Sequence, residues 1–124
     1  MAHDPEFSLS DVHLLKIGRH FRLSPKLKLV VGRNEEDNKK LEALAYDEDV
    51  LFKAAHYPGP LSLLRGEAPP EEIERAAAIT ARYGKAKDLE HVEVLYWKGS
   101  ENTRRSLTAS PMPMSHLKEL MIGE

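Results

Sequence analysis

The 124-residue sequence contains no cysteine. This absence excludes a disulfide framework, a zinc site with thiolate ligands and a cysteine nucleophile within this chain. Apolar runs are short, so we expect neither a membrane-spanning helix nor the apolar segment of a secretory signal. With 41% apolar and 31% charged residues, the composition is typical of an ordinary globular domain with a packed core. We therefore expect a cytoplasmic protein.

Recognisable catalytic and cofactor patterns are also missing. The six histidines stand at positions 3, 13, 20, 56, 91 and 116, and no pair has the spacing of metal ligands on a helix or hairpin. The seven glycines form neither a phosphate-binding loop nor a dinucleotide fingerprint. Acidic residues gather at predicted helix starts, where capping explains them better than acid–base catalysis. We predict no catalytic residue, no metal site and no cofactor for this chain.

The net charge of the chain is small, but basic and acidic residues are strongly segregated along the sequence. The formal net charge is −2, which argues against indiscriminate binding of nucleic acids. Residues 14–34 nevertheless contain no acid and six basic residues: Lys16, Arg19, Arg22, Lys26, Lys28 and Arg33. Residues 35–49 are acidic, and Arg82, Lys85 and Lys87 form a second basic cluster. This segregation is compatible with a polyanion bound on one face, although a solvated surface would also explain it.

The hydrophobic pattern predicts an α+β fold, in which a mostly antiparallel sheet is covered by two main helices and a short C-terminal helix. Asn34 is the expected N-cap of the first helix and Ser115 that of the last. Strands are expected over residues 11–23, 26–31, 50–55, 61–64, 91–97 and 104–109. Helices are expected over residues 35–45, 71–85 and 116–121.

The domain organisation is simple. Residues 1–10 show no periodicity, and we interpret them as a disordered leader or tag. Residues 11–124 then form a single domain, which we expect to be a C-terminal fragment of a larger protein because its amino end begins abruptly.

Residues 32–38 are the first of three segments that suit phosphate binding. Free backbone N–H groups at the helix start, the fork of Arg33 and the amides of Asn34 and Asn38 would together form an anion site. A capped helix without any ligand explains the same residues equally well.

The other two segments combine basic residues with turns. Lys53 precedes the turn at residues 56–59, and Tyr83 precedes Lys85 and Lys87 at the end of the alanine-rich helix. The ring of Tyr83 could stack on a base while the lysines contact the RNA backbone. The alternative for Tyr83 is half-buried packing.

Taken in their order along the chain, these segments resemble the RNA-binding NFACT-R domain family. The resemblance covers about residues 14–97. Its motifs are Val31-Gly32-Arg33-Asn34 with Asn38, Asp49 to Lys53 with Pro58-Gly59, Leu61 to Arg65, and Glu71 to Ala77 with Tyr83-Gly84-Lys85-Ala86-Lys87 and Val92 to Tyr96. The resemblance implies RNA, and specifically tRNA, as the partner. The RNA-binding residues that it implies are Arg33, Asn34, Asn38, Lys53, Arg65, Tyr83, Lys85 and Lys87.

Departures from the family pattern favour one branch. Lys53 replaces a histidine, Gly84 replaces a serine, and residues 110–114 stand in place of a glycine-rich segment. These differences favour the divergent branch fused behind ATP-dependent PP-loop enzymes that resemble tRNA thiouridylases. The chain would then be the non-catalytic tRNA-binding domain of such an enzyme, with the upstream catalytic domain of the same chain as a second partner.

Two other functions stay open. The shared motifs also fit a tRNA-binding module of ribosome-associated quality control. Alternatively, the domain docks on its own catalytic domain through an apolar strip near the C-terminus: Met112, Met114, Leu117, Leu120, Met121 and Ile122. The same tail could instead cover one end of the sheet.

The RNA-binding hypothesis predicts how the motif segments lie relative to one another. The strand end, the proline-glycine turn and the helix end should be neighbours. Their cationic and amide groups should therefore converge on one edge of the sheet: Arg33, Asn34, Lys53, Arg65, Lys85 and Lys87.

Overall fold

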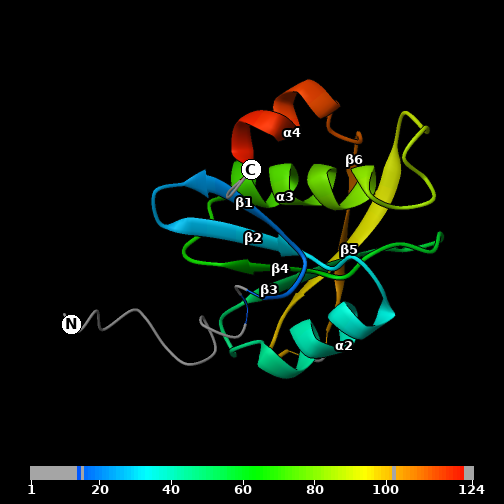
Figure 1. The fold of residues 1–124 in the computed structure, drawn as a ribbon. Helices are drawn as coiled ribbons and strands as arrows, with labels where there is room; N and C mark the ends of the chain where they lie inside the picture. The colour runs from blue at the N-terminus through cyan, green and yellow to red at the C-terminus, as the bar shows by residue number, and fades with distance from the viewer. Residues whose placement is uncertain (1–13, 15, 102, 122–124) are drawn as a thin grey trace.

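Six strands form one antiparallel sheet in the order β1-β2-β4-β3-β5-β6 (Figure 1). The computed structural model describes residues 14, 16–101 and 103–121. The strands are β1 (Arg19–Ser24), β2 (Leu27–Val31), β3 (Val50–Ala54), β4 (Ser62–Arg65), β5 (Val92–Lys98) and β6 (Arg105–Ala109). Every neighbouring pair in the sheet is antiparallel.

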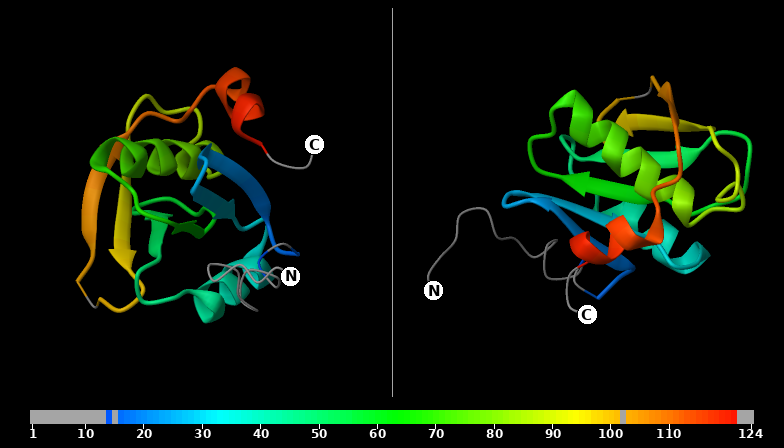
Figure 2. Two further views of the ribbon diagram at one scale, coloured as in Figure 1. Left: turned by 90° about the vertical axis from the view of Figure 1, so that its left-hand side faces the viewer. Right: turned by 90° about the horizontal axis from the view of Figure 1, so that it is seen from above.

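Helices cover both faces of the sheet. Helix α2 (Glu35–Leu44) lies on one face, and α3 (Pro70–Arg82) and α4 (Met114–Leu120) lie on the other. Figure 2 shows that the sheet curves, so that β1–β2 and β5–β6 lie on either side of α3. The predicted α+β fold is confirmed, with two main helices and a short C-terminal one in the part of the chain that the structure describes. None of the helices in this part is both long and apolar enough to cross a membrane.

The alternation of side chains along the strands divides the core in two. In β2, Leu27, Leu29 and Val31 pack on the α3 side, whereas Val30 packs on the α2 side, as the period of two in a strand requires. The α3 side also contains Phe21, Phe52 and the small residues of α3. The α2 side is smaller and is built around Leu41, Leu63 and Trp97.

Helix α3 lies close to the sheet because its inner face is made of small residues. Ala76 and Ala77 are fully buried, and Thr80 donates a hydrogen bond of 2.8 Å to Ser62 in β4. The Ala76 carbonyl oxygen lies 2.9 Å from Thr80 Oγ1 and is an alternative acceptor for the same hydroxyl proton. Both polar side chains of this contact are therefore satisfied inside the core.

Three element boundaries differ from the sequence prediction by more than one residue. Strand β1 begins at Arg19 rather than residue 11, because residues 16–18 form a turn; residues 11–13 and 15 lie outside the described residues, as does the predicted leader. Helix α3 ends at Arg82 rather than residue 85. Helix α4 begins at Met114 after Pro113, so the prediction of Ser115 as its cap is wrong.

The C-terminal segment covers the α3 side of the sheet. The Met112 N–H donates to the Ala78 carbonyl at 3.1 Å, which ties the chain to α3. Leu117 is fully buried in the core, and Met121 forms an isolated bridge with Phe21 in β1. Most apolar side chains of the predicted docking strip thus point into the domain, with Met114 exposed; Ile122 lies outside the described residues.

Candidate functional site

A hollow of about 550 Å³ opens where three separate segments meet. The junction between β2 and α2 contributes one wall, the loop at residues 58–60 the second, and the end of α3 the third. Its lining contains one carboxylate, Glu35, and five cationic side chains: Arg19, Arg33, Arg82, Lys85 and Lys87. A chain with an overall charge of −2 therefore concentrates positive charge at this place.

Gly32 and Asn38 join the first wall to the start of β4. The Gly32 N–H donates to the Leu61 carbonyl at 3.0 Å, and the Leu61 N–H donates to Asn38 Oδ1 at 3.0 Å. A Cβ at position 32 would lie 2.2 Å from Asn38 Oδ1, so a side chain there would have to displace the Asn38 amide from its hydrogen bond with the Leu61 N–H. These two motif residues fix the geometry of the hollow from within.

Pro58, Gly59 and Gly84 bring the other two walls together. The Lys85 N–H donates to the Pro58 carbonyl at 2.9 Å. A Cβ at Gly59 would lie 3.2 Å from the Gly84 Cα, because the two backbones pass close to each other. This contact ends the regular course of α3 and directs residues 85–87 along the rim of the hollow.

Four of the five cations have no carboxylate partner among the described residues. Arg19, Arg82, Lys85 and Lys87 form no ion pair in that part of the chain. Arg33 differs, because its Nε lies 3.1 Å from Asp37 Oδ2 and its backbone N–H donates to the same oxygen at 3.0 Å. Phosphate groups of a ligand would therefore reach Arg19, Arg82, Lys85 and Lys87 without displacing a carboxylate of the protein.

The start of α2 is already occupied by the protein's own acids. Asn34 caps the helix by accepting the Asp37 N–H at 2.8 Å, and Glu35, Glu36 and Asp37 fill the first turn. Burial raises the pKa of Asp37, but the hydrogen bonds and the charge of Arg33 outweigh burial and hold that pKa below its ordinary value. A charged carboxylate at the helix end repels an anion, so the capped-helix interpretation fits residues 34–38 better than an anion site does.

Tyr83 is half-buried and packs inside the domain. Its ring lies 6.0 Å from the ring of Phe21, and the guanidinium of Arg19 lies over it at 4.7 Å from the ring centroid. The packing interpretation of Tyr83 therefore agrees with the structure, and Arg19, which lies over its ring, is exposed.

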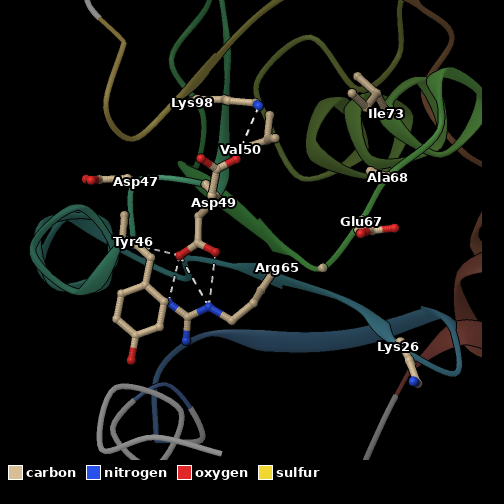
Figure 3. A pocket seen from close by; sticks show the side chains of 13 residues that line it. Lys26, Tyr46, Asp47, Asp49, Val50, Arg65, Glu67, Ala68, Ile73 and Lys98 are labelled. Atoms are coloured by element: carbon tan, nitrogen blue, oxygen red, sulfur yellow. Dashed lines mark hydrogen bonds and ion pairs between the residues drawn. The ribbon is translucent and has the colours of Figure 1, made fainter. Parts of the chain in front are cut away.

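Arg65 does not lie in the hollow. The register of β4 pairs Ser62 with Val31 but Arg65 with Lys28, at the other end of the strand. There Arg65 contacts Asp49 at 2.7 Å, lies over the Tyr46 ring at 4.1 Å and donates to the Leu44 carbonyl at 3.3 Å (Figure 3). Its guanidinium fixes the segment between α2 and β3, and the predicted convergence on one edge does not include it.

Lys53 also lies outside the lining of the hollow. It is exposed on β3, opposite Leu95 in the sheet register. Its neighbours Phe52 and Ala54 pack on the α3 side, so alternation places Lys53 on the α2 side. The structure therefore brings together Arg33, Asn34, Asn38, Tyr83, Lys85 and Lys87, but neither Lys53 nor Arg65.

Arg19 and Arg82 line the hollow but were absent from the site predicted by the sequence. Arg82 belongs to the second basic cluster of the sequence, together with Lys85 and Lys87. Arg19 is in phase with Phe21 and Leu23 of β1, whose burial on the α3 side indicates the direction of its side chain.

The arrangement suits binding of a polyanion. It has a positively charged rim, a concave surface and backbone walls that are fixed by hydrogen bonds. The described residues contain no group of three or more acidic or histidine side chains that could hold a metal ion.

Comparisons with known proteins found a family match and a similar fold. Residues 18–121 match the family described as the NFACT protein RNA binding domain. The fold resembles the C-terminal part of the fibronectin/fibrinogen-binding protein from Streptococcus suis, with a TM-score of 0.76 and 20% identity. The match covers 86% of this chain and 49% of that one, so this chain spans about half of its length. No curated protein matches the sequence. Since the family match covers most of the chain, this protein belongs to the NFACT protein RNA-binding domain family.

Proposed function

We propose that this chain is the non-catalytic tRNA-binding domain of an ATP-dependent tRNA-modifying enzyme of the thiouridylase-like kind, and that it contacts tRNA through the cationic hollow. Membership of an RNA-binding family gives RNA as the partner. The observation that carries the choice of surface is the meeting of five cationic side chains and one carboxylate in the hollow. The segments that form it are those that carry the family motifs.

The choice of branch rests on the motif departures at Lys53 and Gly84 and on the C-terminal segment. In place of a glycine-rich extension, the chain has a short helix whose Leu117 belongs to the core. This segment closes the domain, which suits a compact module appended to an enzyme. The burial of the segment also speaks against the docking function that the apolar strip suggested.

The proposal is tested first with fluorescently labelled, unmodified tRNA. We expect binding at low salt and about a fivefold loss of affinity for Lys85→Ala, since one charge-assisted hydrogen bond contributes about 1 kcal/mol. Lys26→Ala is the matched control, because Lys26 lies outside the hollow, in the turn between β1 and β2. Absence of tRNA binding, or an equal effect of both substitutions, would contradict the proposal.

The enzyme context needs the full-length protein. We expect the full-length protein to modify tRNA in an ATP-dependent reaction. Lys85→Ala should raise KM for tRNA and leave kcat unchanged, because the lysine binds tRNA equally in the ground state and in the transition state and contacts no reacting group. Co-sedimentation with large ribosomal subunits, together with weak binding to free tRNA, would instead identify the ribosome-associated function.

A further inference from the structure

The guanidinium of Arg19 lies over the ring of Tyr83 and lines the hollow. Its carbon lies 4.7 Å from the centroid of the Tyr83 ring. Tyr83 is fixed in turn by the ring of Phe21 and by its place at the end of α3, where its backbone N–H donates to the Thr80 carbonyl at 3.3 Å. Arg19 itself is exposed and lines the hollow. The ring of Tyr83 therefore supports the Arg19 guanidinium in the free protein.

A guanidinium plane of this kind is a suitable support for a nucleobase. Arginine is planar and weakly hydrated, and it stacks on flat ring systems. Proteins that recognise unpaired RNA stack the splayed bases on aromatic rings or on arginine planes. Here the tyrosine supports the arginine, and the arginine itself is exposed at the hollow.

The shape of the hollow favours a single strand. A duplex presents its phosphates on a convex surface with the bases stacked inside, so no base of a duplex reaches a concave floor. A volume of about 550 Å³ lies within the range of about 300–1,000 Å³ that is usual for small-ligand sites. Arg82, Lys85 and Lys87 line the same hollow, where they can contact phosphates on either side of one inserted nucleotide.

We propose that the hollow binds an unpaired RNA segment, with one base stacked on the outer face of the Arg19 guanidinium and the flanking phosphates held by the cations of the α3 end. This inference rests on the proposed function, because it specifies the part of the tRNA that the same surface takes. It adds Arg19 as the residue that distinguishes an unpaired base from a duplex.

The test is a double-mutant cycle between the protein and the RNA. The probe is a labelled single-stranded oligonucleotide of about eight nucleotides, together with versions that each lack one base and a version annealed to its complement. Arg19→Lys keeps the charge and removes the planar group. We expect Arg19→Lys to weaken binding of the intact strand about tenfold. With one of the abasic strands the same substitution should have almost no effect, because the two changes remove one contact.

Two variants separate this inference from the proposed function. Arg22→Lys, the same exchange on β1 but outside the hollow, should bind like the parent protein, and Lys85→Ala should weaken the single strand whether or not a base is missing. If Lys85→Ala weakens binding while Arg19→Lys acts equally on every strand, or if the duplex binds as tightly as the single strand, the stacking inference is wrong and the RNA-binding surface stands. If no RNA binds at all, both are wrong.

Discussion

At the scale of single residues, Arg33 and Arg65 show how a motif cation can be engaged by the protein itself. Asp37 holds the Nε of Arg33, and Asp49 holds the guanidinium of Arg65. The side chain of Asp49 is 4% exposed and that of Arg65 is 19% exposed. Removing one partner of such a pair leaves a charge with little solvent. Both arginines are therefore expected to affect stability when they are substituted.

Arg65→Ala should lower the free energy of unfolding by about 2–3 kcal/mol, somewhat below the usual cost of breaking a buried pair because Arg65 keeps some solvent contact. Lys98→Ala is the matched control. Its partner Glu48 is exposed, and loss of an exposed pair should change stability by less than about 0.5 kcal/mol. Urea unfolding measures both values. A loss of RNA affinity without a loss of stability in Arg65→Ala would show that Arg65 contacts the ligand.

His20 gives the stability of the domain a pH dependence. Burial, followed by the charge of Lys28 and to a lesser degree that of Arg33, lowers the pKa of His20, although the backbone of Ile17 and Leu14 acts in the opposite direction. The unfolded chain then binds more protons between the folded pKa and the ordinary value of about 6.5. The stability contribution is complete above about pH 6.5 and is lost as the pH falls through the folded pKa.

Urea unfolding at about pH 7.5 and about pH 5 checks this expectation. The parent protein should lose more stability between the two values than His20→Gln, which has no titrating ring at this position. The difference between the stability losses of the two proteins does not include His56, because its exposed pair with Glu93 is present in both. Equal pH dependence of the two proteins would show that the pKa of His20 is not lowered in the folded state.

Much of the residue-level site could not be predicted from motif order alone. Motifs state which residues follow each other along the chain, but not at which end of a strand each one lies. Arg65 lies four residues beyond Leu61, and at about 3.3 Å per residue this separates them by roughly 13 Å. Tyr83 and Arg19 are far apart in sequence, and only the packing of α3 on β1 makes them neighbours.

At the scale of elements, the glycines of the β2–α2 junction and of the α3 end differ in what they tolerate. Position 32 has no room for a Cβ, which would meet Asn38 Oδ1 at 2.2 Å. At position 84 the nearest atom, the Pro58 carbonyl oxygen, would be 3.4 Å away. That distance is an ordinary contact, so the serine that stands there in the family pattern would fit.

Gly32→Ala should cost about 1–3 kcal/mol, because displacing Asn38 leaves the Leu61 N–H without its acceptor. Gly84→Ser should stay within about 0.5 kcal/mol of the parent protein. Thermal unfolding of the two variants makes the comparison. The interpretation of the junction fails if Gly32→Ala is as stable as Gly84→Ser.

Helix α4 is expected to act as part of the core. Leu117→Ala should destabilise the domain by about 2–5 kcal/mol, the usual cost of truncating a fully buried leucine. Met114→Ala, on the exposed side of the same helix, should change stability by less than about 0.5 kcal/mol. If both variants are stable but fail to associate with the proposed upstream catalytic domain, the helix is an interface rather than a cover.

Most elements could be predicted because their periodicity is strong. The alternation of Leu27, Leu29 and Val31 and the small-residue face of α3 each correspond to one buried face in the structure. The element ends were less predictable, since tertiary contacts decide them. Helix α3 stops at Arg82 because the following backbone turns to meet Pro58, and no local pattern in residues 83–87 reveals that contact.

At the scale of the whole molecule, charge segregation along the sequence becomes segregation in space. The basic residues of β1, of the β2 end and of the α3 end line one hollow. The acids of residues 47–49 lie at the opposite end of the sheet, around Arg65 and Lys98. A molecule with a small net charge can thus orient a polyanion without a strongly basic composition.

The salt dependence of tRNA binding tests whether the cationic hollow is the surface that holds the RNA. Each phosphate neutralised contributes about −0.7 to −0.9 to the slope of log K against log salt concentration. The double variant Lys85→Ala/Lys87→Ala should therefore lower the magnitude of the slope by about one unit for each lysine removed, whereas Lys26→Ala should leave it unchanged. A double variant with the slope and affinity of the parent protein would contradict the account, because the hollow would then not be the surface that holds the RNA.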